Sequence, residues 1–298
     1  MKGINGWGIF YRLQDSILYY TMYSVLARQM SIPVISFSIM FNHTHALTVD
    51  VPRKLTGTFQ RRLAITFALH YNREYNRKGK LFMDSFGCSE KTNTKSVMGC
   101  TAYVANNSVA GHVNARAVDD RWTMLAYYNN AHPFSTAIVK KKCRPVMLKA
   151  MALVDACFAN NAFLNYALQK RIYSGLFPEE KKQITDYIVY KYRFLDYNML
   201  IDLYGSYEKA LIAIDSNAGS EYEIKDEYGD HSCYRMMLKL MRRFGYDGAD
   251  FNFENLDSGK RIQLANKLLR LTGASMDSIR KFLHLSVETK AKQKVHKA

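Results

Sequence analysis

Met40-Phe-Asn-His-Thr-His-Ala-Leu-Thr-Val49 is the stretch that decides the fold of the first half of this chain. Together with the apolar run at 32–41, it predicts two consecutive β-strands. Because successive side chains of a strand point to opposite faces, we expect His43 and His45 on one face and Asn42 and Thr44 on the other. Two imidazoles on one face could bind the same metal ion. Two histidines that form hydrogen bonds beside a core strand would give the same sequence pattern.

Composition limits the class of protein. The 298 residues are 48% hydrophobic, which is enough for a sizeable core and for two domains, and no apolar run has the length of a membrane span. The five cysteines have no Cys-x-x-Cys spacing, so reduced thiols are expected instead of disulfides or a zinc cluster. The N-terminal residues lack the pattern of a signal peptide. We therefore expect a cytoplasmic protein without a membrane partner.

Positive charge is concentrated in the first half. The net charge is +16, and residues 1–145 hold 19 Lys and Arg against 7 Asp and Glu, a net +12. A basic domain attracts polyanions because its cations displace the counterions of phosphates. We therefore expect a nucleic-acid partner, although a merely soluble basic protein would show the same balance.

The first half is predicted to be βαββαβα, a small antiparallel sheet with helices packed on one face. The predicted strands span 6–13, 32–41, 42–51 and 80–86. The predicted helices span 16–29, 53–77 and 97–107, with Asp15 and Ser96 as caps of the first and third. The second of these helices carries an apolar stripe at every fourth residue: Leu55, Phe59, Leu63, Phe67, Tyr71 and Tyr75.

The second half is predicted to be an all-α domain. Three lysines, Cys143 and Arg144 precede Pro145, which suggests domains at 1–145 and 146–286 and a disordered basic tail at 287–298. Helices are predicted at 147–160, 163–174, 178–194, 197–203, 206–214 and 233–244, with an acidic loop at 216–230. Residues 258–272 and 275–285 have the rhythm of a helix-turn-helix, whose second helix would expose Arg280, Lys281 and His284. Helix pairs of this length are equally common in plain helical domains.

Tyr103 and Asn107 are candidates to complete a site with the two histidines. Their i, i+4 spacing puts them one turn apart on one face of the helix predicted at 97–107. A carboxamide oxygen is a suitable third ligand beside two imidazoles, which would make a site for Mg²⁺ or Mn²⁺. A metal there would neutralise a scissile phosphodiester, while the phenol attacks it and holds the phosphoryl group covalently. Core packing is the default for Tyr71, Tyr75, Tyr127 and Tyr128.

Three motifs in consistent order resemble those of a known family. They are Met40-Phe-Asn-His-Thr-His45, Tyr71-Asn-Arg-Glu-Tyr-Asn-Arg-Lys-Gly-Lys-Leu-Phe82 and Tyr103-Val-Ala-Asn-Asn-Ser-Val109. Over residues 6–128 the chain resembles the single-tyrosine HUH transposases, in particular the repeat-associated (IS200-like) tyrosine transposases. The resemblance implies a ferredoxin-like HUH nuclease domain, His43, His45 and Asn107 as metal ligands and Tyr103 as nucleophile. It also implies cleavage and rejoining of single-stranded DNA near hairpins, through a 5′-phosphotyrosine and a free 3′-OH.

Three departures from the family pattern bear on DNA specificity and leave the four site residues intact. Thr44 replaces a bulky apolar residue, Ala105 and Ser108 stand where the family has His and Pro, and Asp84-Ser-Phe86 lacks a common arginine. The cations predicted to contact DNA lie on the long helix, in the turn after it and on the helix-turn-helix: Arg61, Arg62, Arg73, Arg77, Lys78, Lys80, Arg280 and Lys281.

The leading hypothesis is a DNA transposase-type nickase and strand transferase acting on hairpin-containing single-stranded DNA in the nucleoid. The first alternative is a domesticated protein that binds hairpin DNA without turnover, and the second is a replication initiator or relaxase. A pure binder has no physical need for two histidines, an asparagine and a tyrosine in this pattern, and no P-loop follows the first domain. The sequence leaves open whether the protein is a monomer or a homodimer.

Overall fold

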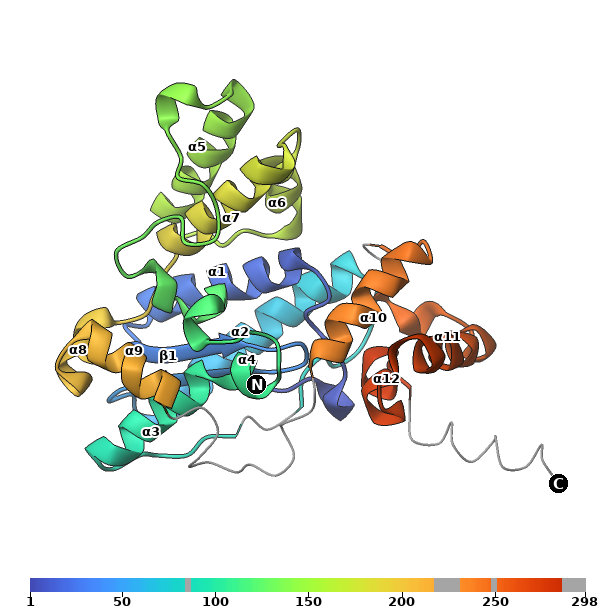
Figure 1. The fold of residues 1–298 in the computed structure, drawn as a ribbon, viewed down its shortest axis with the longest axis horizontal. Helices are drawn as coiled ribbons and strands as arrows, with labels where there is room; N and C mark the ends of the chain where they lie inside the picture. The colour runs from blue at the N-terminus through green and yellow to red at the C-terminus, as the bar shows by residue number, and fades with distance from the viewer. Residues whose placement is uncertain (84–86, 217–230, 248–250, 286–298) are drawn as a thin grey trace.

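A two-stranded antiparallel sheet surrounded by helices forms the centre of the protein (Figure 1). The computed structural model describes residues 1–83, 87–216, 231–247 and 251–285. The predicted basic tail at 287–298, and the predicted acidic loop from residue 217 on, lie outside these residues. The first half contains α1 (Leu13–Gln29), β1 (Val34–Ile39), β2 (Thr44–Thr48), α2 (Arg53–Glu74), α3 (Thr94–Ala105) and α4 (Asn107–Ala110). The predicted α+β fold is confirmed.

The pairing of the sheet extends beyond β1 and β2 through single bridges. In the antiparallel pair, Ser38 lies opposite His45. One isolated bridge joins Lys2 to His43, and another joins Gly3 to Phe82. A parallel bridge joins Val34 of β1 to Leu195, so the paired segments follow the order Phe82, residues 2–3, β2, β1 and Leu195.

The predicted strand at 6–13 is wrong. The backbone N–H groups of Ile9 and Phe10 both bond to the carbonyl of Phe41, and that of Gly8 bonds to the carbonyl of Lys281, each at 3.0 Å. The hydrogen bonds of this segment therefore go to the β1–β2 connection and to a C-terminal helix, so no ladder forms. The predicted strand at 80–86 is likewise reduced to the bridge at Phe82, and residues 84–86 lie outside the described part of the chain.

Helices cover both faces of the sheet, which corrects the prediction that they lie on one face. On one face, the Thr44 hydroxyl lies 2.9 Å from the Tyr19 hydroxyl of α1. On the opposite face, the Ser36 hydroxyl of β1 donates to the backbone oxygen of Thr101 in α3 at 2.9 Å. The sheet therefore separates an aromatic core beneath α1 from the surface that α3 crosses.

The start of α1 and the end of α2 have local causes. Asp15 is not the N-cap of α1 but its third residue, and its carboxylate accepts the N–H of the capping Arg12 at 2.8 Å. Of the six stripe positions, five lie within α2 and four of these are buried, Phe59, Leu63, Phe67 and Tyr71; the sixth, Tyr75, lies just beyond the helix and is buried too. α2 ends at Glu74 because Asn76 takes a left-handed conformation with φ 47°.

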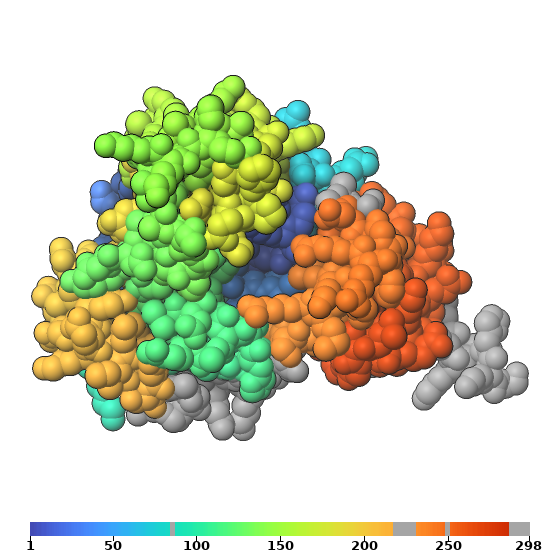
Figure 2. Space-filling model, turned by 45° about the horizontal axis from the view of Figure 1, so that its top comes forward, coloured from blue at the N-terminus to red at the C-terminus, as the bar shows by residue number. Residues whose placement is uncertain are grey.

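The helices of the second half form three groups around the first half. The first group, α5 (Pro145–Ala159), α6 (Tyr166–Tyr173) and α7 (Pro178–Lys191), lies over α1, and the second, α8 (Tyr197–Tyr204) and α9 (Tyr207–Ser216), lies beside α3. The third group is α10 (Ser232–Arg243), α11 (Ser258–Thr272) and α12 (Met276–Phe282). Figure 2 shows the first and third groups as separate projections with blue surface of the first half between them.

One continuous cluster of buried side chains runs through both halves. The start of α5 at Pro145 coincides with the predicted boundary, but the division into two domains stays a prediction. Among the described residues, no helix has the length and apolarity needed to cross a bilayer.

Candidate active site

His43 and His45 lie side by side, and Tyr103 faces the second of them. The ring centroids of the two histidines are 4.9 Å apart, and the centroid of the Tyr103 ring is 5.7 Å from that of His45. β2 carries His45 and α3 carries Tyr103, and the two elements are in contact. The structure thus brings together three side chains that the sequence supplies from two separate stretches.

Asn42 sets the tautomer of His43. The Asn42 Nδ2 donates to the Gly6 carbonyl at 2.8 Å, and a carbonyl can only accept, so the amide oxygen must face the imidazole. That oxygen is 2.8 Å from His43 Nδ1. In a neutral ring Nδ1 therefore carries the proton and Nε2 carries the lone pair, which is the form that binds a metal. Both side chains are buried, at 5% and 4% exposed.

α3 is fixed at its start and along its length, which positions Tyr103. Its N-cap is Asn93, whose side chain accepts the N–H of Ser96 at 2.9 Å; the prediction of Ser96 as cap was three residues late. The Tyr204 hydroxyl of α8 donates to the Met98 carbonyl at 2.8 Å. Tyr103 itself is only half-buried.

Three of the four tyrosines assigned to the core by default are buried, and the fourth stacks on another ring. Tyr71, Tyr75 and Tyr127 are at most 1% exposed, and burial raises the pKa of each phenol. Raised pKa values make them poorer nucleophiles, and no substrate could reach them. Tyr128 is half-buried, but its ring stacks on Tyr207 with centroids 4.2 Å apart, away from the histidines.

Asn107 lies one turn after Tyr103, as predicted, but it is not in the same helix. α3 ends at Ala105, and α4 begins at Asn107. The Asn107 Nδ2 donates to the carbonyls of Tyr103 and Val104 at 3.0 and 3.3 Å, which closes the last turn of α3. Its amide nitrogen is therefore committed to the backbone, and the amide oxygen is the atom suited to a metal.

The residues at this site fit a divalent ion by their chemistry. His43 offers Nε2 in the required tautomer, His45 offers a second imidazole, and Asn107 offers an amide oxygen. Within the described ranges, no group of three or more His, Cys, Asp or Glu side chains is arranged to hold a metal. Asn107 as the third protein ligand of a metal here stays a prediction, because the contacts shown for its side chain are to the carbonyls of Tyr103 and Val104.

Sequence reasoning missed a third histidine at the site. The His231 ring centroid is 5.8 Å from that of His43 and 5.1 Å from that of Tyr234, and its backbone N–H donates to the Gly111 carbonyl at 3.0 Å. His231 precedes α10 at the end of a segment with no recognisable motif, so only the tertiary fold brings it to β2.

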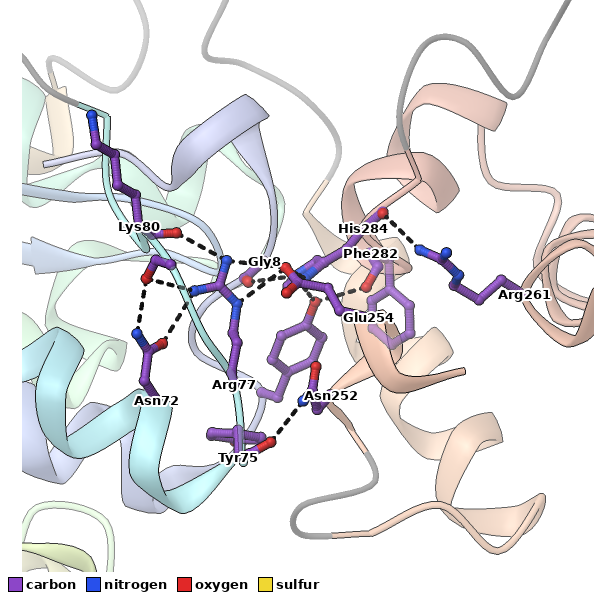
Figure 3. Close-up of polar contacts among 12 residues, drawn as sticks. Gly8, Asn72, Tyr75, Arg77, Lys80, Asn252, Glu254, Arg261, Phe282 and His284 are labelled. Carbon is purple, nitrogen blue, oxygen red and sulfur yellow. Dashed lines mark hydrogen bonds and ion pairs between the residues drawn. The ribbon is translucent and has the colours of Figure 1, made fainter. Parts of the chain in front are cut away.

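Arg77, which the sequence predicts to contact DNA, is buried and engaged within the protein, so the structure gives that prediction no support. Arg77 is 8% exposed, and its guanidinium bonds Glu254 at 3.0 Å, the Asn72 side-chain oxygen at 3.1 Å and the Lys80 carbonyl at 2.9 Å. These contacts join the end of α2 to the segment before α11 (Figure 3). The helix stripe could not reveal this, because the chain turns after Glu74 and carries Arg77 inwards. Five other predicted cations are exposed: Arg61, Arg62, Arg73, Lys78 and Lys80.

The second helix of the predicted helix-turn-helix faces inwards more than expected. His284 is 4% exposed, its ring stacks on Trp7 with centroids 4.7 Å apart, and its Nε2 lies 2.9 Å from the Tyr11 hydroxyl, which corrects the prediction of an exposed side chain. Arg280 and Lys281 are half-buried and both pair with Asp277, at 2.9 and 2.7 Å. The ring of His284 therefore packs on the N-terminal segment, whereas the ion pairs of Arg280 and Lys281 lie within α12 itself.

Comparison with known proteins found no matching family model, curated protein or solved structure. The functional interpretation therefore rests on the residues and their geometry.

Proposed function

We propose that the protein is a metal-dependent tyrosine transposase that nicks and rejoins single-stranded DNA next to hairpins. The observation that carries the proposal is the row of three rings, His43 beside His45 and His45 beside Tyr103, at centroid distances of 4.9 and 5.7 Å. Two metal-ligand side chains next to a half-buried tyrosine suit attack on a phosphodiester better than they suit binding alone.

The proposed reaction is a transesterification. The Tyr103 hydroxyl loses its proton as its oxygen attacks phosphorus and forms a phosphotyrosine bond. The bond from phosphorus to the 3′ oxygen breaks, and the departing 3′ oxygen takes up a proton to become the free 3′-OH. Rejoining reverses these steps with a 3′-OH as the attacking group. A bound Mg²⁺ or Mn²⁺, held by His43, His45 and Asn107, supplies charge neutralisation at the scissile phosphate. Asn42 holds His43 in the tautomer that this requires.

We also propose that the sheet is a shortened ferredoxin-like HUH sheet. The bridge from Phe82 to Gly3, the bridge from Lys2 to His43 and the β1–β2 pair support this reading. α1 and α2 lie in the two connections that a β-α-β-β-α-β unit needs. The helices after Pro145 would then be additions that wrap this unit, with a role in choosing the DNA.

The proposed partner is hairpin-containing single-stranded DNA, which would associate the protein with the nucleoid. A net +12 over residues 1–145 and the exposed cations Arg61, Arg62, Arg73, Lys78 and Lys80 support a phosphate-binding surface. Arg280 and Lys281 are weaker candidates because Asp277 already neutralises part of their charge.

The test is covalent capture of DNA. With a labelled hairpin oligonucleotide and Mn²⁺, the wild type should form an adduct that survives SDS, and a chelator should abolish it. Tyr103→Phe should form none, whereas Tyr128→Phe, which removes a hydroxyl from another half-buried tyrosine, should form as much as the wild type. Wild-type protein that binds the hairpin without forming an adduct would instead support the hairpin-binding alternative.

A further inference from the structure

α10 has a strongly basic outer face. Its twelve residues include no carboxylate and four cations: Arg235, Lys239, Arg242 and Arg243. All four are exposed, and none is ion-paired with another residue in the described part of the chain. Their i, i+4, i+7 and i+8 spacing puts them on one side of the helix, opposite the buried Met237 and Met241. An ordinary solvated face mixes charges of both signs, so this face indicates an anionic partner.

A cleft of about 250 Å³ opens between the first half and the start of α10, the orange surface next to blue in Figure 2. Its lining includes Arg235 and two half-buried aromatic side chains, Phe41 and Trp122, on which an unpaired base can stack. Among its described lining residues, Asp120 is the only acid, and it is 6% exposed. The volume is below the range of about 300–1,000 Å³ for pockets of drug-sized ligands, so it suits a group as small as one base.

The cleft adjoins the candidate active site. His231 lines the cleft, and its ring centroid is 5.8 Å from that of His43. Met40, three positions before His43, lines it as well. Arg235 belongs to both the cleft and the basic face, and its one hydrogen bond within the described residues goes to the neutral Asn114 side chain at 3.3 Å. A strand that leaves the candidate active site through the cleft therefore reaches the basic face of α10 next.

We propose that the single-stranded DNA beside the candidate active site runs through this cleft and along α10. An unpaired base lies in the cleft, and successive phosphates contact Arg235, Lys239 and Arg242, which span about 10 Å of helix at 1.5 Å per residue. A duplex stem is a less suitable occupant, because its bases are paired and none can enter the cleft. The inference rests on the proposed function and adds which surface holds the strand.

Fluorescence anisotropy without divalent metal measures DNA binding before any cleavage. The probe is a labelled hairpin that carries a single-stranded extension, titrated across a salt series. The triple variant Arg235→Gln/Lys239→Gln/Arg242→Gln should bind at least about tenfold more weakly than the wild type. Its slope of log affinity against log salt should fall by about 2, because each phosphate contact to a single strand contributes about 0.7.

A matched variant controls for the loss of three positive charges. Lys149→Gln/Lys170→Gln/Arg171→Gln removes three exposed cations of α5 and α6 and should keep the wild-type slope. Both triple variants should melt at the wild-type temperature, because the side chains that they lose are exposed. If the α10 variant melts lower, its three single substitutions replace it, and each should lower the slope by about 0.7.

Two further probes identify the occupant. A blunt hairpin without the extension should bind the wild type and the α10 variant with equal slopes; a loss of slope with this probe would put the stem on α10 and overturn the proposal. An extension of abasic nucleotides should keep the slope but bind the wild type at least about fivefold more weakly, because it cannot stack. Unchanged affinity for it would refute the base in the cleft.

The salt slopes separate this inference from the proposed reaction. Equal slopes of the wild type and the α10 variant on the extended hairpin would overturn the inference, whether or not Tyr103 forms an adduct. A loss of slope in the α10 variant, together with a wild type that forms no adduct, would leave this surface as the strand-binding surface and refute only the nickase.

Discussion

Replacing Arg77 and Arg73 one at a time separates a structural charge from a DNA-binding charge at the same end of α2. Arg77 is 8% exposed and bridges three partners, whereas Arg73 is exposed on the helix surface. Breaking a buried ion pair costs about 3–5 kcal/mol, and because the Glu254 side chain keeps 29% exposure we expect about 2–4 kcal/mol for Arg77→Met. Arg73→Met should change stability by no more than about 0.5 kcal/mol.

For DNA binding we expect the opposite order: Arg73→Met should have the larger effect and Arg77→Met the smaller. Loss of one phosphate contact lowers the slope of log affinity against log salt by about 0.9. Arg73→Met should show this loss, and Arg77→Met should keep the wild-type slope while it remains folded. Urea unfolding followed by circular dichroism gives the stabilities, and fluorescence anisotropy of a labelled hairpin across a salt series gives the slopes. An Arg77→Met variant with unchanged stability and a reduced slope would refute the structural assignment.

The pH dependence of the same variant gives an independent check. Burial alone would raise the pKa of the Glu254 carboxyl, but the His284 ring, whose Nδ1 lies 3.5 Å from the carboxylate, and the charge of Arg77 leave it lowered. A carboxyl whose pKa is lower in the folded state contributes stability above its unfolded pKa of about 4.3. That contribution is lost as the pH falls through the pKa that Glu254 has in the folded state. The stability difference between wild type and Arg77→Met should therefore shrink below about pH 4.

Three further substitutions test other contacts. Asn42→Ala should lower the free energy of unfolding by about 1–3 kcal/mol for each buried group left unpaired. It should also weaken Mn²⁺ binding measured by calorimetry, because His43 loses its fixed tautomer. Unchanged metal affinity would contradict that role of Asn42. Burial raises the pKa of Asp120 to about 6, so Asp120 makes wild-type stability fall as the pH rises from about 4 to 6. Urea unfolding should show that Asp120→Asn loses this part of the pH dependence; an unchanged dependence would contradict the assignment. Gly8→Ala puts a Cβ 2.4 Å from the Phe41 ring and should lower the free energy of unfolding by about 1–3 kcal/mol. An unchanged melting temperature would show that the ring moves aside.

The spacing of apolar residues was sufficient to predict the helix and the strand whose apolar side chains are buried at that same spacing. The apolar stripe of α2 recurs every four residues, and its side chains from Phe59 to Tyr71 are buried. The apolar run at 32–41 becomes β1, in which all six residues are buried. In both cases the pattern is produced by the burial itself, so the sequence carries the whole signal.

Periodicity failed where the hydrogen-bond partners of a segment come from far along the chain. The segment 6–13 has the composition of a strand, but its N–H groups bond to Phe41 and to Lys281 of α12. Arg77 was misread for the same reason, since its partner Glu254 lies 177 positions away. Neither contact leaves a local trace in the sequence. Tertiary contacts between distant elements therefore account for the main errors in both fold and site.

The residues around the two histidines show where strand alternation holds and where it stops. Thr44 and His45 alternate as predicted: the Thr44 hydroxyl meets Tyr19 of α1, while His45 faces Tyr103. Asn42 was expected on the face opposite His43, but β2 begins only at Thr44, and in the bend before it the Asn42 amide reaches the neighbouring imidazole. Because Asn42 lies outside the strand, its side chain can turn toward the neighbouring ring. Its amide oxygen then gives His43 the tautomer that binds a metal.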